Sequence, residues 1–487
     1  MSQTYPEPQP VPPTAAGPAS KRGGWLAAIL PVVLIAACSE LGISVLSNSA
    51  LPIYFTTGLK IPTSVYTLLM LPFFISEVLF KSPLGVLADR VGRRPLMLGG
   101  ALVTVFTPLI LISVHYNPAA ATAIITLLVF GILRAMDGAG QAAIWPSLYA
   151  YVGDVVAEKS RGAAMGLLNV VYMAGLSLSL LIGGLVDSTF GPIFTHEMTF
   201  GGQLHKLGKQ VGSHLHREHA ARVAAALPPA PLSHQPEYYY PSFILASLLF
   251  ALATFAALAV RERRRAGVVA AAADAEASNE SVSWSGFMDA LRTVPQFLGL
   301  AVVTFLGIGC IMPLVKKFAL DEYGMTETAF GIHALGPAFV IALISVPVGH
   351  LADRWGKTQS VRAGFALCAL GLWGIPLLHH FHVGILGFIG AVTVLGVGFV
   401  AAFPAWLALL ADLGGEERRG TVFAAVSTAQ GIGALGGVAV SGLLYDKIGH
   451  IAPFVAASIL VSLGTLLAFL FVRPQAIQTS EKKLQKH

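Results

Sequence analysis

Glu40, Arg134 and Asp137 are charged side chains that lie inside long apolar stretches of this 487-residue sequence. Glu40 lies about two-thirds of the way along the apolar run 25–49, and Arg134 and Asp137 share the stretch ILRAMDGAGQAA. An ionisable group at the centre of a bilayer costs roughly 2.5–3.5 kcal/mol on insertion scales, so those that occur there are candidates for function. Because burial disfavours the charged form of a carboxyl group, Glu40 is suited to take up and release a proton. We predict that Glu40, Arg134 and Asp137 form a proton-coupling site.

Each of these charges also has a purely structural interpretation. Ser44 and Ser47 follow Glu40 on the same helical face, and the carboxylate could instead be hydrogen-bonded to a neighbouring helix. Asp137 comes three residues after Arg134, a spacing that allows the two to form a neutral buried pair. The sequence alone leaves these alternatives open.

A second group of polar residues is predicted to line a cavity for a substrate. Tyrosine and tryptophan combine a broad apolar surface with one polar group. The candidates are Asn48, Asn169, Tyr172, Trp406 and Gln430. Lys316 and Lys317, in contrast, close an apolar run and are expected to extend their ammonium groups outward to water.

Motifs that carry other chemistries are missing from the sequence. It has no phosphate-binding GxxxxGK[ST] loop, which argues against direct coupling to ATP. A GxSxG elbow and an HExxH helix are also missing from the apolar stretches, so no enzyme is predicted. His214, His216 and His219 could bind zinc or copper, but no cysteine or well-spaced carboxylate completes a site. We therefore predict neither a metal nor a cofactor.

Composition and hydropathy place the chain in a lipid bilayer. It is 55% hydrophobic and only 11% charged, whereas a soluble globular protein has about 25% charged residues. This balance excludes a water-soluble enzyme, a disordered protein and a secreted disulfide scaffold. A membrane helix needs roughly 20 mostly apolar residues. The twelve candidate spans are 25–49, 64–84, 96–114, 121–142, 163–186, 242–260, 297–315, 329–348, 361–378, 383–410, 421–444 and 451–472.

The basic residues predict an orientation. Lysine and arginine are concentrated in the loops that lie inside when the N-terminus is inside, so both termini are expected to be cytoplasmic in a plasma (inner) membrane protein. The predicted parts are a disordered cytoplasmic tail (1–24), an N-terminal six-helix bundle (25–260) with a long exterior loop (187–241), a cytoplasmic linker with an amphipathic helix (261–294), a C-terminal six-helix bundle (295–473) and a cytoplasmic tail (474–487).

The two halves of the sequence repeat each other. GVLADRVGRR at 85–94 resembles GHLADRWGK at 349–357. Pro146, Asp154, Glu158, Arg161 and Gly162 recur as Pro404, Asp412, Glu416, Arg419 and Gly420. Two matches in the same order indicate an all-α membrane fold of twelve helices in two parallel six-helix repeats. This arrangement is typical of transporters that rock around a site at the membrane midplane.

The repeated loop resembles the signature loop between helices 2 and 3 of the major facilitator superfamily, with its weaker copy between helices 8 and 9. The resemblance covers residues 25–472 apart from the exterior insertion. It implies a cytoplasmic charge cluster that latches the two halves together and breaks as the protein opens inward; simple positive-inside anchoring is the alternative. The latch residues are Gly85, Asp89, Arg90, Gly92, Arg93, Arg94, Glu158, Arg161, Asp353, Arg354 and Gly356.

Other motifs resemble those of the drug–proton antiporter branch of this superfamily. The stretch around Arg134 is similar to its helix-4 motif, with Asp137 where glutamine is usual. The segment NSALP at 48–52 is similar to the end of its first-helix motif, although the family's aspartate falls at Ile43 and the carboxylate here is Glu40. The fifth span keeps the glycines of the antiporter motif but lacks its Gly-Pro pair.

The resemblance implies a secondary transporter that moves small organic molecules by alternating access. We expect proton-coupled efflux of amphipathic compounds. One alternative is proton-coupled uptake or facilitated diffusion of an organic solute, and another is a non-transporting membrane sensor on the same scaffold. The expected partners are a small-molecule substrate, a proton and the lipid bilayer, with no nucleic acid, and the expected state is a monomer.

Overall fold

Each predicted apolar run folds as a helix, because a backbone in lipid can satisfy its N–H and C=O groups within one segment only in this way. The computed structural model describes residues 24–118, 122–156, 158–210, 235–260, 295–414 and 419–472. No strand occurs in these ranges. The fold is all-α, as the sequence predicts.

The helices form two sets of six membrane-crossing units. The N-terminal set is α1 (Gly24–Ser44), which continues through η1 (Val45–Ala50), α2 (Leu51–Ile53) and η2 (Tyr54–Gly58), then α3 (Thr63–Val91), α4 (Arg93–Ser113), α5 (Ala123–Val155), α6 (Glu158–Gln210) and α8 (Tyr240–Ala259), which follows η4 (Pro236–Tyr239). The C-terminal set is α11 (Pro295–Ile311) with α12 (Val315–Tyr323), α13 (Glu327–Trp355), α14 (Lys357–His380), α15 (Ile385–Gly414), α16 (Arg419–Lys447) and α17 (Ala452–Phe471). Among the described residues, ten helices are long and apolar enough to cross a membrane, and the bent pair α11–α12 makes an eleventh. The 29-residue α13 takes the place of the twelfth.

The two sets pack their helices in the same way. In the N-terminal half, α1 contacts α6 and α8, α3 contacts α5, and α4 contacts α5 and α8. In the C-terminal half, the corresponding contacts join α11 with α16 and α17, α13 with α15, and α14 with α15 and α17. The repeat predicted from the sequence is therefore also a repeat of tertiary packing.

The repeated sequence motif folds as the same turn in both halves. Gly92, between α3 and α4, has φ 108° and ψ 161°. Gly356, between α13 and α14, has φ 87° and ψ 149°. Side chains rarely allow these backbone angles, which explains glycine at both positions. The two turns lie at the same end of the protein, which we call the motif end.

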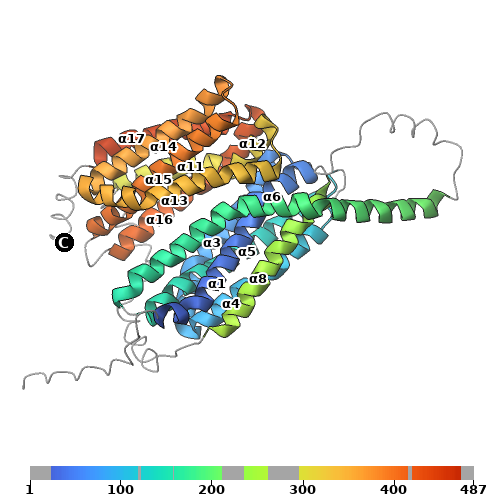
Figure 1. Ribbon diagram of the computed structural model, residues 1–487, viewed down its shortest axis with the longest axis horizontal. Coiled ribbons are helices and arrows are strands. Elements are labelled where there is room, and N and C mark those ends of the chain that lie inside the picture. Colours follow the sequence, from blue (N-terminus) through green and yellow to red (C-terminus); the bar gives the residue numbers. More distant parts are fainter. Residues whose placement is uncertain are drawn as a thin grey trace, which may run out of the picture.

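The two halves meet at the opposite end, which we call the sealed end. α6 packs against α13, and α3 packs against α16. Hydrogen bonds that join the halves lie close to the beginnings of α3 and α13. The halves converge where α6 meets the beginning of α13 and diverge from there toward the motif end (Figure 1).

The fifth unit differs from the prediction of a loop beginning at residue 187. α6 is one helix of 53 residues that continues to Gln210, and its last part projects beyond the bundle (Figure 1). The segment EMTFGGQLHKLGKQ contains no proline, and its good helix formers (Glu, Met, Gln, Leu and Lys) outnumber its three glycines. The predicted tails, the linker with its amphipathic helix, and His214, His216 and His219 lie outside the described residues.

Candidate functional site

Glu40 is buried in the N-terminal half, with 4% of its surface exposed. Ser44, one turn further along α1, donates a hydrogen bond from Oγ to Glu40 Oε1 over 2.9 Å. α6 passes close to the carboxyl group at Gly175, where a Cβ atom would lie only 2.8 Å from Glu40 Cγ. The missing side chain at Gly175 therefore makes the room that the Glu40 side chain occupies.

Three aromatic side chains surround Glu40. Trp145 of α5 is a hydrogen-bonding neighbour of the carboxylate, and Tyr149 and Tyr172 lie within electrostatic range of it. The centre of the Trp145 ring lies 5.6 Å from that of Tyr149 and 5.3 Å from that of Tyr172. Sequence reasoning identified Tyr172 but missed the other two, although their spacing of four residues on one helix was a signal for a shared face.

These residues lie near α3, a helix that also packs against α16 of the C-terminal half. Glu77 of α3 also lies within electrostatic range of Glu40, and it pairs with Lys81 over 3.2 Å. The next residue, Val78, lies 3.6 Å from the position that a Cβ atom on Gly431 of α16 would take. The group consisting of Glu40, Trp145, Tyr149 and Tyr172 is called the carboxylate–aromatic cluster below.

Arg134 and Asp137 form an enclosed ion pair. Arg134 Nη1 lies 2.8 Å from Asp137 Oδ2, and both side chains are 1% exposed. Arg134 Nη2 donates to Ser47 Oγ over 2.9 Å, and the guanidinium lies 4.7 Å from the centre of the Phe73 ring. Thr107 donates its hydroxyl hydrogen to the other oxygen of Asp137. The buried pair allowed by the spacing is present, and its part in proton coupling stays a prediction.

A row of polar side chains leads from this ion pair toward Glu40. Ser47 bonds to Arg134 and Ser44 bonds to Glu40, and the two serines are one turn apart. Gln141 lies two turns after Arg134 on the same face of α5. It is 4% exposed, and neither of its amide atoms has a hydrogen-bond partner among the described residues. Buried polar groups are normally paired, so Gln141 has a donor and an acceptor available one helical turn after Asp137.

The other predicted cavity residues lie in different surroundings. Asn48 in η1 and Gln430 in α16 are half-buried, and Asn169 in α6 is exposed. Trp406 is only 4% exposed and packs between two phenylalanine rings at 5.8 and 6.3 Å. Trp406 therefore belongs to the core of the C-terminal half, because an indole with rings on two sides has little surface left for a ligand.

At the motif end, the described latch residues contact their own half. Arg93 Nε lies 3.7 Å from Asp154 Oδ2, and Arg94 donates to the carbonyl oxygen of Leu258 over 2.9 Å. Sequence reasoning missed Asp154 as a partner, although it belongs to the repeated pattern. No described atom lies within 4 Å of a Cβ placed on Gly85, so this residue makes no close helix contact in this arrangement. The side chains of six latch residues lie outside the described part: Asp89, Arg90, Glu158, Arg161, Asp353 and Arg354.

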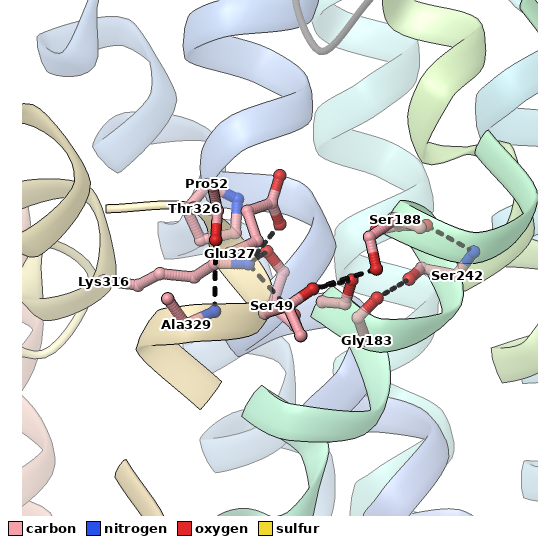
Figure 2. Close-up of polar contacts among 12 residues, drawn as sticks. Ser49, Pro52, Gly183, Ser188, Ser242, Lys316, Thr326, Glu327 and Ala329 are labelled. Carbon is pink, nitrogen blue, oxygen red and sulfur yellow. Dashed lines mark hydrogen bonds and ion pairs between the residues drawn. The ribbon is translucent and has the colours of Figure 1, made fainter. Parts of the chain in front are cut away.

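The prediction that Lys316 and Lys317 extend to water is wrong. Their exposed fractions are 4% and 9%. Lys316 Nζ lies 2.6 Å from the carbonyl oxygen of Ser49, 3.0 Å from Ser49 Oγ and 2.6 Å from Glu327 Oε2 (Figure 2). Lys317 Nζ lies 2.8 Å from Asp321 Oδ2. The partners of Lys316 lie on separate helices, so the sequence around it gives no sign of them.

Three further hydrogen bonds close the sealed end. Thr328 Oγ1 forms hydrogen bonds of 2.9 Å with the carbonyl oxygen of Gly184 and with Ser188 Oγ. The backbone N–H of Ser64, in the first turn of α3, donates to Asp446 Oδ2 over 2.7 Å. These bonds link α6 to α13 and α3 to α16. The contact between the two halves at the sealed end, which we call the seam, is therefore bonded on both of its sides.

Comparison with known proteins agrees with this architecture. The chain matches the sequence pattern of the Major Facilitator Superfamily over residues 32–305 and 297–487. It is 23% identical over 385 residues to the magnetosome protein MamH of Paramagnetospirillum magneticum (76% of this chain, 75% of that protein), and 28% identical over 173 residues to the class G tetracycline resistance protein of Vibrio anguillarum (34% and 42%). A solved bacterial homolog of the human lysosomal transporter Spinster has a TM-score of 0.66 at 15% identity, over 95% of this chain and 98% of that one. The duplicated helix packing and the match across both halves show that the chain belongs to the Major Facilitator Superfamily and is a membrane transporter.

Proposed function

We propose that the protein exports small amphipathic molecules in exchange for protons, and that it prefers molecules with a positive charge. The observation that supports this proposal is the carboxylate–aromatic cluster. Aromatic faces attract organic cations, and a carboxylate supplies the countercharge. The same carboxylate can bind a proton instead, but a neutral carboxyl group no longer attracts a cation.

Competition for Glu40 is sufficient for exchange. A proton that reaches Glu40 while the site is open to the outside displaces a bound cation. After the halves rock, loss of the proton on the other side restores the charge that binds the next molecule. The carrier thus moves a proton inward and a substrate molecule outward in turn, and the proton gradient drives the export.

The polar row gives this exchange a path to the rest of the N-terminal half. Protonation of Glu40 changes the hydrogen bond from Ser44, and Ser47 on the same helix bonds to Arg134. We propose that Arg134, Asp137 and Gln141, which all lie on α5, respond to the protonation of Glu40 through these hydrogen bonds. Asn48, Asn169 and Gln430 stay candidates for substrate contacts farther along the cavity.

We further propose that the motif end faces the cytoplasm of a plasma membrane and that the sealed end faces outside. The excess of basic residues in the loops of the motif end favours this orientation. The arrangement described here is then the one in which substrate enters from the cytoplasm. The tetracycline resistance protein among the relatives supports the outward direction of transport.

The direct test is transport of ethidium, an amphipathic cation, into proteoliposomes with an imposed pH gradient. We expect Glu40→Gln to lower gradient-driven transport by about tenfold or more, because a lost interaction with a charged group costs about 1.5–3 kcal/mol. Glu40→Asp, which keeps the carboxylate, should retain a measurable response to the gradient. Gradient-driven transport that continues unchanged in Glu40→Gln would refute the assignment.

A second pair of variants tests the position of Glu40 without changing its charge. Gly175→Ala places a Cβ 2.8 Å from Glu40 Cγ and should weaken transport, whereas Gly166→Ala on the same helix meets no described atom within 4 Å and should not. Equal effects of the two would contradict the geometry. Flux that ignores the gradient in the unmodified protein would favour facilitated diffusion, and no flux of any cation tested would favour a sensor.

A further inference from the structure

Three ionisable side chains are buried together at the sealed end, each from a different helix. Asp187 of α6 is 0% exposed, Lys316 of α12 is 4% exposed, and Glu327 of α13 is 9% exposed. Asp187 belongs to the N-terminal half, and the other two belong to the C-terminal half. None of them takes part in the function proposed above.

The ammonium group of Lys316 has acceptors from both halves. Ser49 supplies its carbonyl oxygen and Oγ at 2.6 and 3.0 Å, and Glu327 supplies Oε2 at 2.6 Å. The three hydrogen atoms of the ammonium group are thus matched by three acceptors. Figure 2 shows the lysine extending toward Ser49 of the other half and Glu327 of its own half.

Asp187 is only partly satisfied. The backbone N–H of Ser242, in the first turn of α8, donates to Asp187 Oδ1 over 3.0 Å. Asp187 Oδ2 is buried and has no hydrogen-bond partner in the described part of the chain. A charged carboxylate oxygen without a partner is costly in a buried site, and a neutral carboxyl group in the same place is much less so.

The charges at this site do not balance. Lys316 and Glu327 both lie within electrostatic range of Asp187, so two carboxyl groups share one ammonium group. The other titratable groups that face the pair are Tyr238 and Tyr239 of η4, which are neutral when protonated. Polar neighbours come from η1 (Ser49) and α8 (Ser242). One excess negative charge is therefore enclosed unless a carboxyl group carries a proton.

We propose that the Asp187–Glu327 pair binds one proton when the sealed end is closed and releases it when the halves part there. This is a second proton site, separate from Glu40. Opening the seam moves Asp187 away from Glu327, because they belong to different halves, and lets water reach both carboxylates. The proton is then no longer needed to balance the charge. The inference requires only that the halves part at this seam during transport, and it does not depend on Glu40.

The sign of the pH effect follows from the proton count. The closed seam binds one more proton than the open seam, so a lower pH favours closure. Over the range in which the pair titrates, the ratio of closed to open protein should change by up to about tenfold per pH unit.

The fraction of protein with a closed seam can be measured without a substrate. Lys60 and Lys447 lie on opposite halves at the mouth of the sealed end, so cysteines at these positions can carry a pair of spin labels. The three native cysteines are buried and would be replaced by alanine. Pulsed electron spin resonance in liposomes would then give the fraction of short, closed-state distances at each pH.

Asp187→Asn removes the excess charge and should keep the seam closed at every pH tested. Glu327→Gln should do the same, since Lys316 is then left with one carboxylate. The double variant leaves Lys316 with no carboxylate, so it should open the seam more than either single variant or the unmodified protein at acid pH. If each residue only contributed packing, the single variants would not keep the seam closed while the double variant opens it. Size-exclusion chromatography and circular dichroism would check that each variant is folded.

Glu237→Gln is the matched control. Glu237 lies in η4 at the same end, is half-buried and carries the same charge, so this variant should keep the pH response of the unmodified protein. Because the closed fraction is measured without substrate or flux, this result can be obtained whether or not the protein exports cations. A pH response that persists in Asp187→Asn, or a closed fraction that is independent of pH in the unmodified protein, would overturn the inference.

Discussion

Replacing Gly331 by valine should abolish transport while both six-helix halves stay folded. Gly331 lies in the second turn of α13, where a Cβ atom would lie 2.5 Å from Leu181 Cα and 2.7 Å from the carbonyl oxygen of Leu180 on α6. These are backbone atoms, which cannot turn aside as a flexible side chain can. The sealed end of the variant therefore cannot close. A carrier that works by alternating access needs both arrangements, so we expect the loss of all net transport.

Gly336→Val is the matched control for this prediction. It makes the same change on the same helix, but no described atom lies within 4 Å of the added Cβ. Valine is also not a worse helix former than glycine, so neither variant should weaken α13 itself. Flux in proteoliposomes and the distance between labels on Lys60 and Lys447 would both be measured. Normal transport in Gly331→Val would show that the tight approach of α6 to α13 is not needed in the cycle.

Neutralising one member of the Arg134–Asp137 pair should strongly destabilise the N-terminal half. Breaking a buried ion pair from one side costs about 3–5 kcal/mol, because the other charge stays buried without a partner. The two single variants should differ. Asp137→Asn leaves a guanidinium that cannot lose its proton, whereas Arg134→Met leaves a carboxylate that can become neutral by binding one. We therefore expect the larger loss of stability in Asp137→Asn.

Thermal unfolding in detergent would measure these losses. The double variant Arg134→Met with Asp137→Asn should be more stable than Asp137→Asn alone, since no unpaired charge is left. Lys81→Met provides a control for a pair closer to the surface, where about 0–1 kcal/mol is expected. If the double variant loses as much stability as the two single variants together, the two side chains stabilise the protein independently.

Several features could be predicted from the sequence because they depend on local composition or on spacing within one helix. The twelve apolar runs and their duplication led directly to the fold. The pairing of Arg134 with Asp137 follows from a spacing of three residues, and the turns at Gly92 and Gly356 follow from a repeated motif. The burial of Glu40 could also be expected from local composition, since this residue lies within an apolar run.

Other features depend on which helices become neighbours, and they were missed or wrong. Lys316 was expected to reach water, but it is buried against Ser49 because α12 meets η1 of the other half. The aromatic rings around Glu40 come from two other helices, and Trp406 has its surroundings set by packing within the C-terminal half. The unbroken helix of α6 past residue 187 was also not foreseen.

By itself, the sequence determined that the chain lies in a membrane, that its halves are duplicates, and which few charges the apolar runs contain. Hydropathy, helical spacing and repetition are properties of one chain segment at a time. Only the tertiary structure decided which charges are neutralised and by which partners, and at which end the two halves are joined. These contacts bring together residues hundreds of positions apart, such as Ser64 and Asp446, and no local pattern records them.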